Sequence, residues 1–289
     1  MKVLSFGEIL WDVYPDKRFI GGAPLNFAAH LAKHGAKVHM LSALGKDELG
    51  DASISRVKDF GIKDDFISYV GDKETGKCIV TLDENGIPNY NLLQNVAYDY
   101  ITCDKEASGF DLLYFGSLAL RSTYNLDSLK KLMAENSFGE VFVDVNIRPP
   151  FYSRESVGFC VENASIVKIS SEELPVVIDL LGMENAATYN EFCVALAGRY
   201  ESLKLIILTL GADGAFAYDC RAQKAYTCPG RKVEVASTVG AGDSFSAAFV
   251  YQYLNNKGLD FCLDYASKVA AFVVSNYEAI PEYSPEMFT

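Results

Sequence analysis

The chain has 289 residues, of which 49% are hydrophobic and 22% are charged, and its net charge is −12 at pH 7. This composition is typical of a globular protein with a sizeable core, and the acidic balance disfavours nucleic-acid binding because like charges repel. No apolar run of about 18 residues is present and the N-terminal segment is too short and too acidic for a signal peptide, so we expect a cytoplasmic protein without a membrane partner.

Strand-length apolar runs alternate with segments of helical period along the chain. Strands are predicted at residues 3–10, 38–44, 112–117, 141–146, 166–170 and 205–210, and helices at about 22–34, 47–60, 126–135, 172–181, 189–200, 241–255 and 261–277. This alternation predicts one α/β domain over residues 1–289, with a mainly parallel sheet covered by helices on both faces. Ligands of such folds bind at the carboxyl ends of the strands.

Two segments interrupt the alternation. Residues 12–21 are short and polar, and residues 64–91 look like successive short strands with turns at Gly71-Asp72 and Asn85-Gly86. We expect these segments, at about 12–21 and 64–100, to form a small β-lid near the strand ends. Its open edges could pair with the lid of a second copy, so a homodimer is a further expectation.

A glycine-rich turn opens the helix predicted near residue 241. Gly240, Ala241 and Gly242 would leave backbone N–H groups free at the positive end of the helix, which suits a phosphate group. Asp243 follows in the first turn. A carboxylate at this position can also be no more than a helix cap, so the turn alone leaves both interpretations open.

The wider pattern favours the phosphate interpretation. Residues 237–243 resemble the signature D-T-x-G-A-G-D of the ribokinase-like (PfkB) carbohydrate kinases, and residues 21–26 resemble the second signature of that family, G-G-x-x-x-N. Asp12 and the segments 144–149, 168–173 and 208–214 extend the resemblance over essentially the whole chain. It implies a ribokinase-like three-layer sandwich and an ATP-dependent sugar kinase that uses Mg2+.

The resemblance also implies a role for individual residues. Asp243 matches the catalytic base that takes the proton of the sugar hydroxyl, and Gly240, Ala241 and Gly242 match the anion hole. The positions that match sugar-binding residues are Asp12, Gly21, Gly22 and Asn26, joined by Asn146 and Arg148 after a strand end. Arg148 could contact the sugar, contact the triphosphate, or pair with a surface carboxylate.

A further set of positions matches the nucleotide and metal side of the family site. Glu173 would hold Mg2+ through water, although Ser170 replaces the usual asparagine. Lys168 could reach the triphosphate or be a solvated edge charge. The remaining nucleotide-side positions are Thr209, Gly211, Gly214 and Asn276. Ser237 replaces the first aspartate of the signature, which weakens the case for K+ as a second cation but leaves it open.

Two other patterns do not support a function. Residues 71–77 match the beginning of a P-loop, but Cys78 and a strand-like run follow, so we expect a turn of the lid. His30 and His34 lie four residues apart without the glutamate of a zinc protease, so we expect them to be surface or packing residues.

The segment GGAPLNFAAHLAKHG resembles fructokinases more than other branches of the family. The expected reaction is therefore transfer to the primary 6-hydroxyl of fructose, giving fructose 6-phosphate. Ribose, a nucleoside and 2-keto-3-deoxygluconate stay open as acceptors. A sugar- or nucleotide-sensing regulator without turnover is the alternative of another class, and the intact Gly240–Asp243 segment argues against it.

Overall fold

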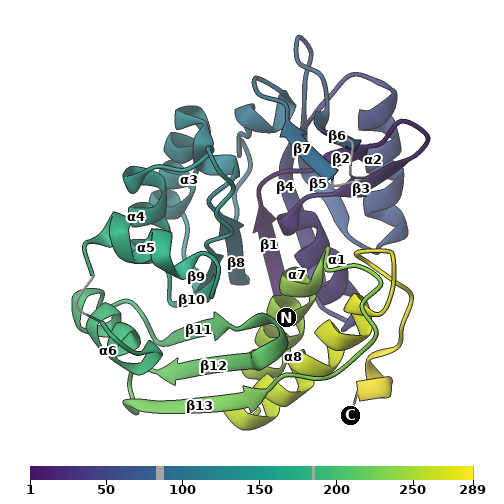
Figure 1. Ribbon diagram of the computed structural model, residues 1–289. Helices are drawn as coiled ribbons and strands as arrows, with labels where there is room; N and C mark the ends of the chain where they lie inside the picture. Colours follow the sequence, from purple (N-terminus) through teal and green to yellow (C-terminus); the bar gives the residue numbers. More distant parts are fainter. Residues whose placement is uncertain (83–87, 184–185, 289) are drawn as a thin grey trace.

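A nine-stranded sheet lies at the centre of the described protein, and helices cover both of its faces (Figure 1). The computed structural model describes residues 1–82, 88–183 and 186–288. The strand order is β13-β12-β11-β10-β9-β8-β1-β4-β5. Neighbours from β11 to β5 run parallel, whereas β12 and β13 add antiparallel to one edge. These strands are β1 (Lys2–Phe6), β4 (Lys37–Gly45), β5 (Lys63–Val70), β8 (Phe110–Gly116), β9 (Phe138–Asp144), β10 (Ile166–Ser170), β11 (Leu205–Thr209), β12 (Gly214–Asp219) and β13 (Lys224–Pro229).

Two hydrophobic cores, one on each face of the sheet, hold the layers together. One core packs α1 (Ala23–Lys33), α2 (Glu48–Asp59), α7 (Ala241–Leu254) and α8 (Leu259–Val274) against the sheet. The other packs α3 (Thr123–Glu135), α4 (Arg154–Asn163), α5 (Leu174–Leu181) and α6 (Tyr189–Arg199). The central strands are buried on both faces, which explains their continuous apolar runs.

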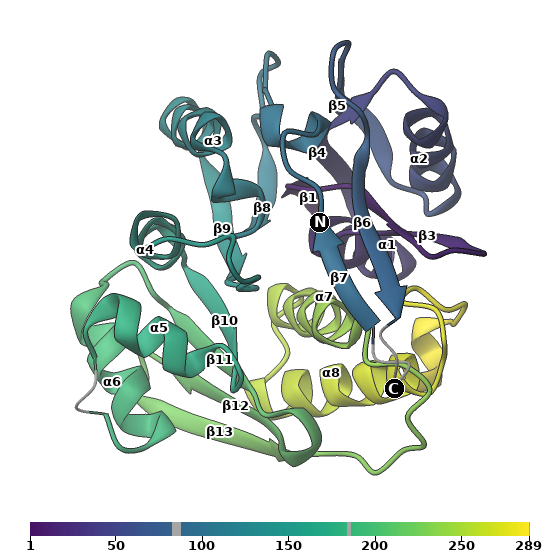
Figure 2. The same ribbon diagram turned by 45° about the horizontal axis from the view of Figure 1, so that its top comes forward.

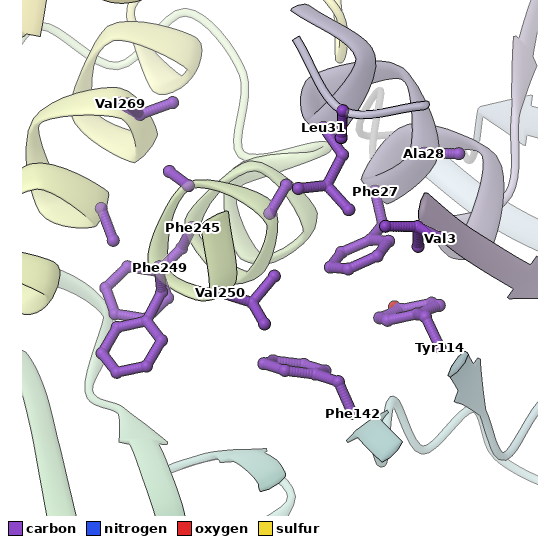
Figure 3. Packing of buried hydrophobic residues seen from close by; sticks show 14 of the residues in the cluster. Val3, Phe27, Ala28, Leu31, Tyr114, Phe142, Phe245, Phe249, Val250 and Val269 are labelled. Atoms are coloured by element: carbon purple, nitrogen blue, oxygen red, sulfur yellow. The ribbon is translucent and has the colours of Figure 1, made fainter. Parts of the chain in front are cut away.

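Aromatic side chains fill the core beneath α1 and α7 (Figure 3). The ring of Phe27 stacks on that of Tyr114 with centroids 3.7 Å apart, and both lie near Phe142. Phe245 and Phe249 extend this packing along α7. This packing fixes α1 and α7 to the main sheet and to each other.

A second sheet of four strands lies at the top of Figure 1, where the sequence predicts a lid, and we refer to it as the lid sheet or lid. Its order is β3-β2-β6-β7, with β2 (Leu10–Val13), β3 (Arg18–Gly21), β6 (Gly76–Leu82) and β7 (Pro88–Leu92). Figure 2, in which the top of Figure 1 comes forward, shows β3, β6 and β7 of this sheet. The turn expected at Asn85-Gly86 lies outside the described residues, but the strands on either side of it pair antiparallel.

Two expected boundaries were wrong. Residues 64–70 belong to β5, which pairs with β4 in the main sheet rather than in the lid, because its partly buried positions pack there beside α2. The single strand expected over 3–10 is two strands in different sheets. The chain turns between them at Gly7, whose φ of 145° and close approach to Pro24 both exclude a side chain.

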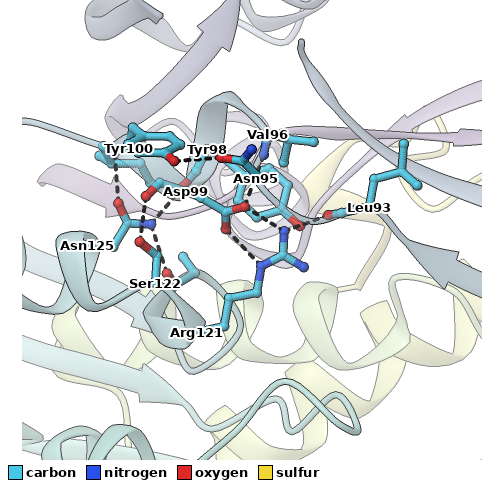
Figure 4. A network of polar contacts seen from close by, with 11 residues as sticks. Leu93, Asn95, Val96, Tyr98, Asp99, Tyr100, Arg121, Ser122 and Asn125 are labelled. Carbon is cyan, nitrogen blue, oxygen red and sulfur yellow. Dashed lines mark hydrogen bonds and ion pairs between the residues drawn. The ribbon is translucent and has the colours of Figure 1, made fainter. Parts of the chain in front are cut away.

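A buried ion pair anchors the base of the lid to the main body (Figure 4). Arg121 donates to both carboxylate oxygens of Asp99, at 2.8 and 3.0 Å, and to the carbonyl of Leu93 at 2.7 Å. Asp99 in turn accepts the N–H of Val96. Because the segment after β7 is tied in this way, the lid returns to the body at a fixed position.

Candidate active site

The glycine turn lies at the N-terminus of α7, as the sequence predicts. Gly240 is the N-cap residue with a φ of 79°, and Ala241 begins the helix. A Cβ at position 240 would lie 2.7 Å from the carbonyl oxygen of Ala279, so the turn requires glycine for space as well as for φ. The N–H of Ala241 is not free, contrary to the sequence prediction, because it donates to the carbonyl of Thr238 at 3.3 Å in the turn. The first-turn N–H groups of Gly242 and Asp243 have no partner within the helix and form its positive end. An anion would be stabilised there.

The carboxylate of Asp243 is held by a side chain from the other signature segment. Asn26 on α1 donates from Nδ2 to Oδ2 of Asp243 at 2.8 Å, across 217 residues of sequence. Burial raises the pKa of Asp243, while the hydrogen bond from Asn26 and the charge of Lys168 oppose that rise. Asp243 is therefore a stronger proton acceptor than an ordinary aspartate and remains anchored in one orientation.

Lys168 lies directly beneath the glycine turn. Its Nζ is 3.0 and 3.1 Å from the carboxylate oxygens of Asp144, and a Cβ on Gly242 would lie 3.2 Å from the same Nζ. Its side chain is only 7% exposed, so of the two alternatives for Lys168 the solvated edge charge is wrong. Burial lowers the pKa of Lys168, but the Asp144 and Glu173 carboxylates outweigh burial and raise it above its usual value. Burial raises the pKa of Asp144, and the Lys168 ammonium opposes that rise.

Glu173 precedes α5 at the carboxyl end of β10. Its Oε1 accepts the N–H of Ile147 at 2.7 Å, and its Oε2 accepts the N–H of Ser170 at 2.8 Å. Ser170 returns a contact, because its Oγ accepts the N–H of Glu173 at 3.3 Å. Each carboxylate oxygen keeps one lone pair, which fits a water-mediated contact with Mg2+ better than a bidentate one. In the described part of the chain, no cluster of three or more His, Cys, Asp or Glu side chains is suited to a metal.

The expected sugar-binding positions surround the same end of the sheet. Asp12 on β2 lies over Gly21, where an added Cβ would be 3.5 Å from Oδ2 of Asp12. Gly22 has a φ of 111°, and a Cβ there would lie 2.4 Å from the carbonyl oxygen of Glu8. Asn146 takes a left-handed φ of 44° directly after β9, and the nearby Arg148 is exposed. The positive charge of Arg148 acts on both Asp12 and Asp243.

The nucleotide-side positions follow the end of β11 and of α8. Thr209 ends β11 and accepts the N–H of Ser171 at its carbonyl. Gly211 and Gly214 take φ values of 57° and 110° in the turn before β12. Asn276 directs its amide back to the carbonyl of Phe272, 2.7 Å away, so it ends its own helix. The structure brings the first three together and places Asn276 on the C-terminal segment.

Sequence reasoning missed one ionisable group of this site. Glu8 lies between β1 and β2 and is 2% exposed. Burial is the main reason that the pKa of Glu8 rises to about 7, and the nearby Asp243 carboxylate raises it further. A glutamate directly after Gly7 at a strand end was the available signal, because strand ends carry ligand sites in this fold class.

A buried carboxylate, a helix start with free N–H groups and a small second sheet near the carboxyl ends of parallel strands suit the alignment and electrostatic stabilisation that phosphoryl transfer requires. Fold and site thus define a kinase class that acts on a small hydroxyl compound. The chain belongs to the pfkB family of carbohydrate kinases, because the sequence model of that family matches residues 6–286.

Relatives and solved structures agree with this membership. The chain is 26% identical to probable fructokinase-5 of Arabidopsis thaliana, over 96% of this chain and 93% of the relative. It is also 26% identical to a 5-dehydro-2-deoxygluconokinase of Listeria monocytogenes, over 96% and 88%. The fold superposes on fructokinase from Vibrio cholerae, solved with fructose, ADP and calcium, with a TM-score of 0.83 at 20% identity over 99% and 98%. The predicted ribokinase-like sandwich and the predicted sugar kinase are therefore confirmed.

Proposed function

We propose that the protein transfers the γ-phosphoryl group of ATP to a primary hydroxyl of a neutral sugar, with fructose as the preferred acceptor. The observation that carries the proposal is the hydrogen bond between Asn26 and Asp243, which joins the two signature segments at the glycine turn. The carboxylate that would take the proton thereby lies beside the N–H groups that would hold the transferred phosphoryl group.

Each residue has a task in this reaction. Asp243 accepts the proton of the attacking hydroxyl, and the free N–H groups of Gly242 and Asp243 at the start of α7 stabilise the charge on the phosphoryl oxygens. Lys168 adds positive charge beneath the turn, 3.2 Å from where a side chain on Gly242 would begin. Glu173 would hold Mg2+ through water, and the metal would neutralise charge on the triphosphate when bound.

The charges around the sugar positions favour a neutral acceptor. Glu8, Asp12 and Asp243 place three carboxyl groups there, and Arg148 is the cation whose charge acts on all three of them. A sugar acid would bring another carboxylate into this surrounding, and like charges repel. The 2-keto-3-deoxygluconate alternative is disfavoured on this ground, whereas ribose and nucleosides are distinguished only by experiment.

The decisive experiment is coupled ADP release with Mg2+-ATP and a panel of fructose, ribose, adenosine and 2-keto-3-deoxygluconate. We expect the highest kcat/KM with fructose and fructose 6-phosphate as the product. Asp243→Asn is the matched control for contaminating kinases. Highest kcat/KM with the sugar acid would refute the proposed acceptor. ADP release at the control level with every compound, together with thermal stabilisation by ATP, would favour the sensing regulator.

Three further proposals concern the surroundings of the reaction. The lid edges β3 and β7 and the exposed rings of Phe19 and Tyr90 suit pairing with a second lid, which light scattering would detect as a dimer. K+ would meet a hydroxyl at Ser237 where the family signature has a carboxylate, and comparing turnover in K+ and Na+ would test whether it acts as a second cation. Among the described residues no helix is long and apolar enough to cross a membrane.

We propose a cytoplasmic location, which fractionation of cells would test.

A further inference from the structure

His30 occupies a buried position on α1, one helical turn beyond Asn26. The sequence suggested only a surface or packing role. Its side chain is fully buried, and both ring nitrogens meet polar partners. Nε2 is 2.9 Å from the carbonyl oxygen of Ala279, and Nδ1 is 2.7 Å from the hydroxyl of Tyr283. Any buried imidazole needs polar partners, and what distinguishes His30 is that one of its partners is the backbone beside the glycine turn.

The partners of His30 fix its tautomer. Burial lowers the pKa of His30 to about 3, so the ring is neutral and carries a single N–H. A carbonyl oxygen can only accept, so the N–H is on Nε2 and donates to Ala279. Nδ1 is then the acceptor for the Tyr283 hydroxyl. One ring nitrogen is therefore a hydrogen-bond donor and the other an acceptor, and the two bonds hold the ring in one orientation.

The segment that His30 holds forms the outer wall of the glycine turn. A Cβ at Gly240 would lie 2.7 Å from the oxygen, 2.9 Å from Cβ and 3.0 Å from Cα of Ala279. The wall therefore lies in van der Waals contact with the turn, and any shift of Ala279 would change the space that Gly240 occupies. Lys33, also on α1, adds an ion pair to Glu282 at 3.0 Å.

We propose that His30 is a positioning residue for phosphoryl transfer, which sets the anion-binding turn by holding Ala279 against Gly240. One rigid helix then fixes both parts of the reaction centre: Asn26 orients the Asp243 base, and His30 orients the wall of the turn. The inference rests on the proposed role of the turn at Gly240–Gly242.

The proposed role predicts a specific kinetic defect. If the carbonyl of Ala279 loses the hydrogen bond from His30, the glycine turn can relax. Its N–H groups then no longer converge on the position of the transferred phosphoryl group. Such groups act on charge that develops in the transition state, so kcat should fall more than sugar affinity. Loss of one well-placed donor costs about 10²–10³-fold, and a relaxed turn should cost less, on the order of 10–100-fold.

Two amide variants of His30 distinguish the loss of the hydrogen-bond donor from the loss of packing. His30→Gln places an amide N–H near the position of Nε2 and can still donate to Ala279, whereas His30→Asn is one methylene shorter and reaches only toward Tyr283. We expect His30→Asn to lose kcat by about 10–100-fold with the sugar KM changed less than about threefold. His30→Gln should keep most of the wild-type kcat.

The affinity for a transition-state mimic tests the positioning role, because a variant that is merely less stable would not change it. The affinity for ADP with aluminium fluoride, measured relative to ADP alone in the presence of sugar, should fall in His30→Asn by about the same factor as kcat. His34→Gln is the control, because buried His34 is the C-cap of α1 and its Nδ1 bonds the carbonyl of His30 rather than that of Ala279, although its ring packs against Tyr251, Tyr265 and Tyr283. It should lower the melting temperature and leave that ratio unchanged.

Several results would overturn the inference. These are an unchanged kcat in folded His30→Asn, equal losses in the Gln and Asn variants, or a fall in kcat without a fall in the affinity ratio. The proposed function is tested separately on the same preparation with Asp243→Asn. If that variant is inactive while His30→Asn is normal, only the positioning role fails. If Asp243→Asn retains turnover, the proposed function itself is refuted, whatever the result for His30→Asn.

Discussion

The ion pair beneath the glycine turn allows a quantitative prediction. Lys168 lies 3.0 and 3.1 Å from the oxygens of Asp144, and the exposed fractions of the two side chains are 7% and 1%. Lys168→Met removes the cation and leaves Asp144 buried. Breaking a buried pair from one side costs about 3–5 kcal/mol. Because Ser246 still donates to Asp144 at 3.2 Å, we expect the lower end, about 3 kcal/mol at neutral pH.

The sign of the pH dependence follows from the carboxylate that remains. Burial already raises the pKa of Asp144, and loss of the Lys168 charge would raise it further. An acid whose pKa is higher in the folded than in the unfolded state destabilises the fold increasingly as the pH rises between those values. The deficit of Lys168→Met should therefore shrink as the pH falls from about 8 toward 6, by at most about 1.4 kcal/mol per pH unit.

Urea denaturation followed by circular dichroism measures both effects. The double variant Lys168→Met with Asp144→Asn removes both charges and should recover much of the lost stability. Lys130→Met is the surface control, since its pair with Glu155 is exposed and should contribute less than about 1 kcal/mol. A loss below about 1 kcal/mol for Lys168→Met, independent of pH, would refute the reasoning about the buried pair.

Three other predictions concern the sugar side. Sugar binding should slow amide exchange in β6 and β7 several-fold and leave the distant edge β12–β13 unchanged, and equal exchange with and without sugar would contradict lid closure. Arg148→Gln should raise the sugar KM by about tenfold, which corresponds to ~1.4 kcal/mol, without lowering the melting temperature; an unchanged KM would remove Arg148 from the site. Because the pKa of Glu8 is raised from 4.5 to about 7, its ionisation costs stability as the pH rises between these values. Glu8→Gln should therefore gain stability relative to wild type from about pH 5 to about pH 7, and a stability difference that is constant over this range would contradict the prediction.

Much of the fold could be predicted because the signals were local. The parallel strands are buried on both faces and appear as apolar runs, and glycines mark the ends of several helices. The antiparallel strands β12 and β13 were not predicted. β13 is mostly exposed at an edge of the sheet and lacks an apolar run, whereas β12 carries a buried apolar run that was an available signal. Helix α4 was also not predicted, although its buried Val157, Cys160 and Val161 have helical spacing.

Site residues that belong to a local sequence motif could be predicted. Site contacts that form only when distant segments fold together could not. The segment Gly240–Asp243 reveals an anion-binding helix start by its own sequence. The contact of Lys168 with Asp144 joins two neighbouring parallel strands, and pairing of strands distant in sequence is invisible to local patterns. The same is true of His30, whose partners lie 249 and 253 residues further along the chain.

Turnover of Asp243→Asn tests the central claim most directly. The amide keeps the size of the carboxylate but cannot take the proton of the sugar hydroxyl. With wild-type folding verified by circular dichroism, kcat should fall by about 10²–10⁴-fold while the dissociation constant for the sugar, measured by calorimetry, changes by less than about tenfold. A variant that turns over within about tenfold of the wild type would show that the proton goes elsewhere.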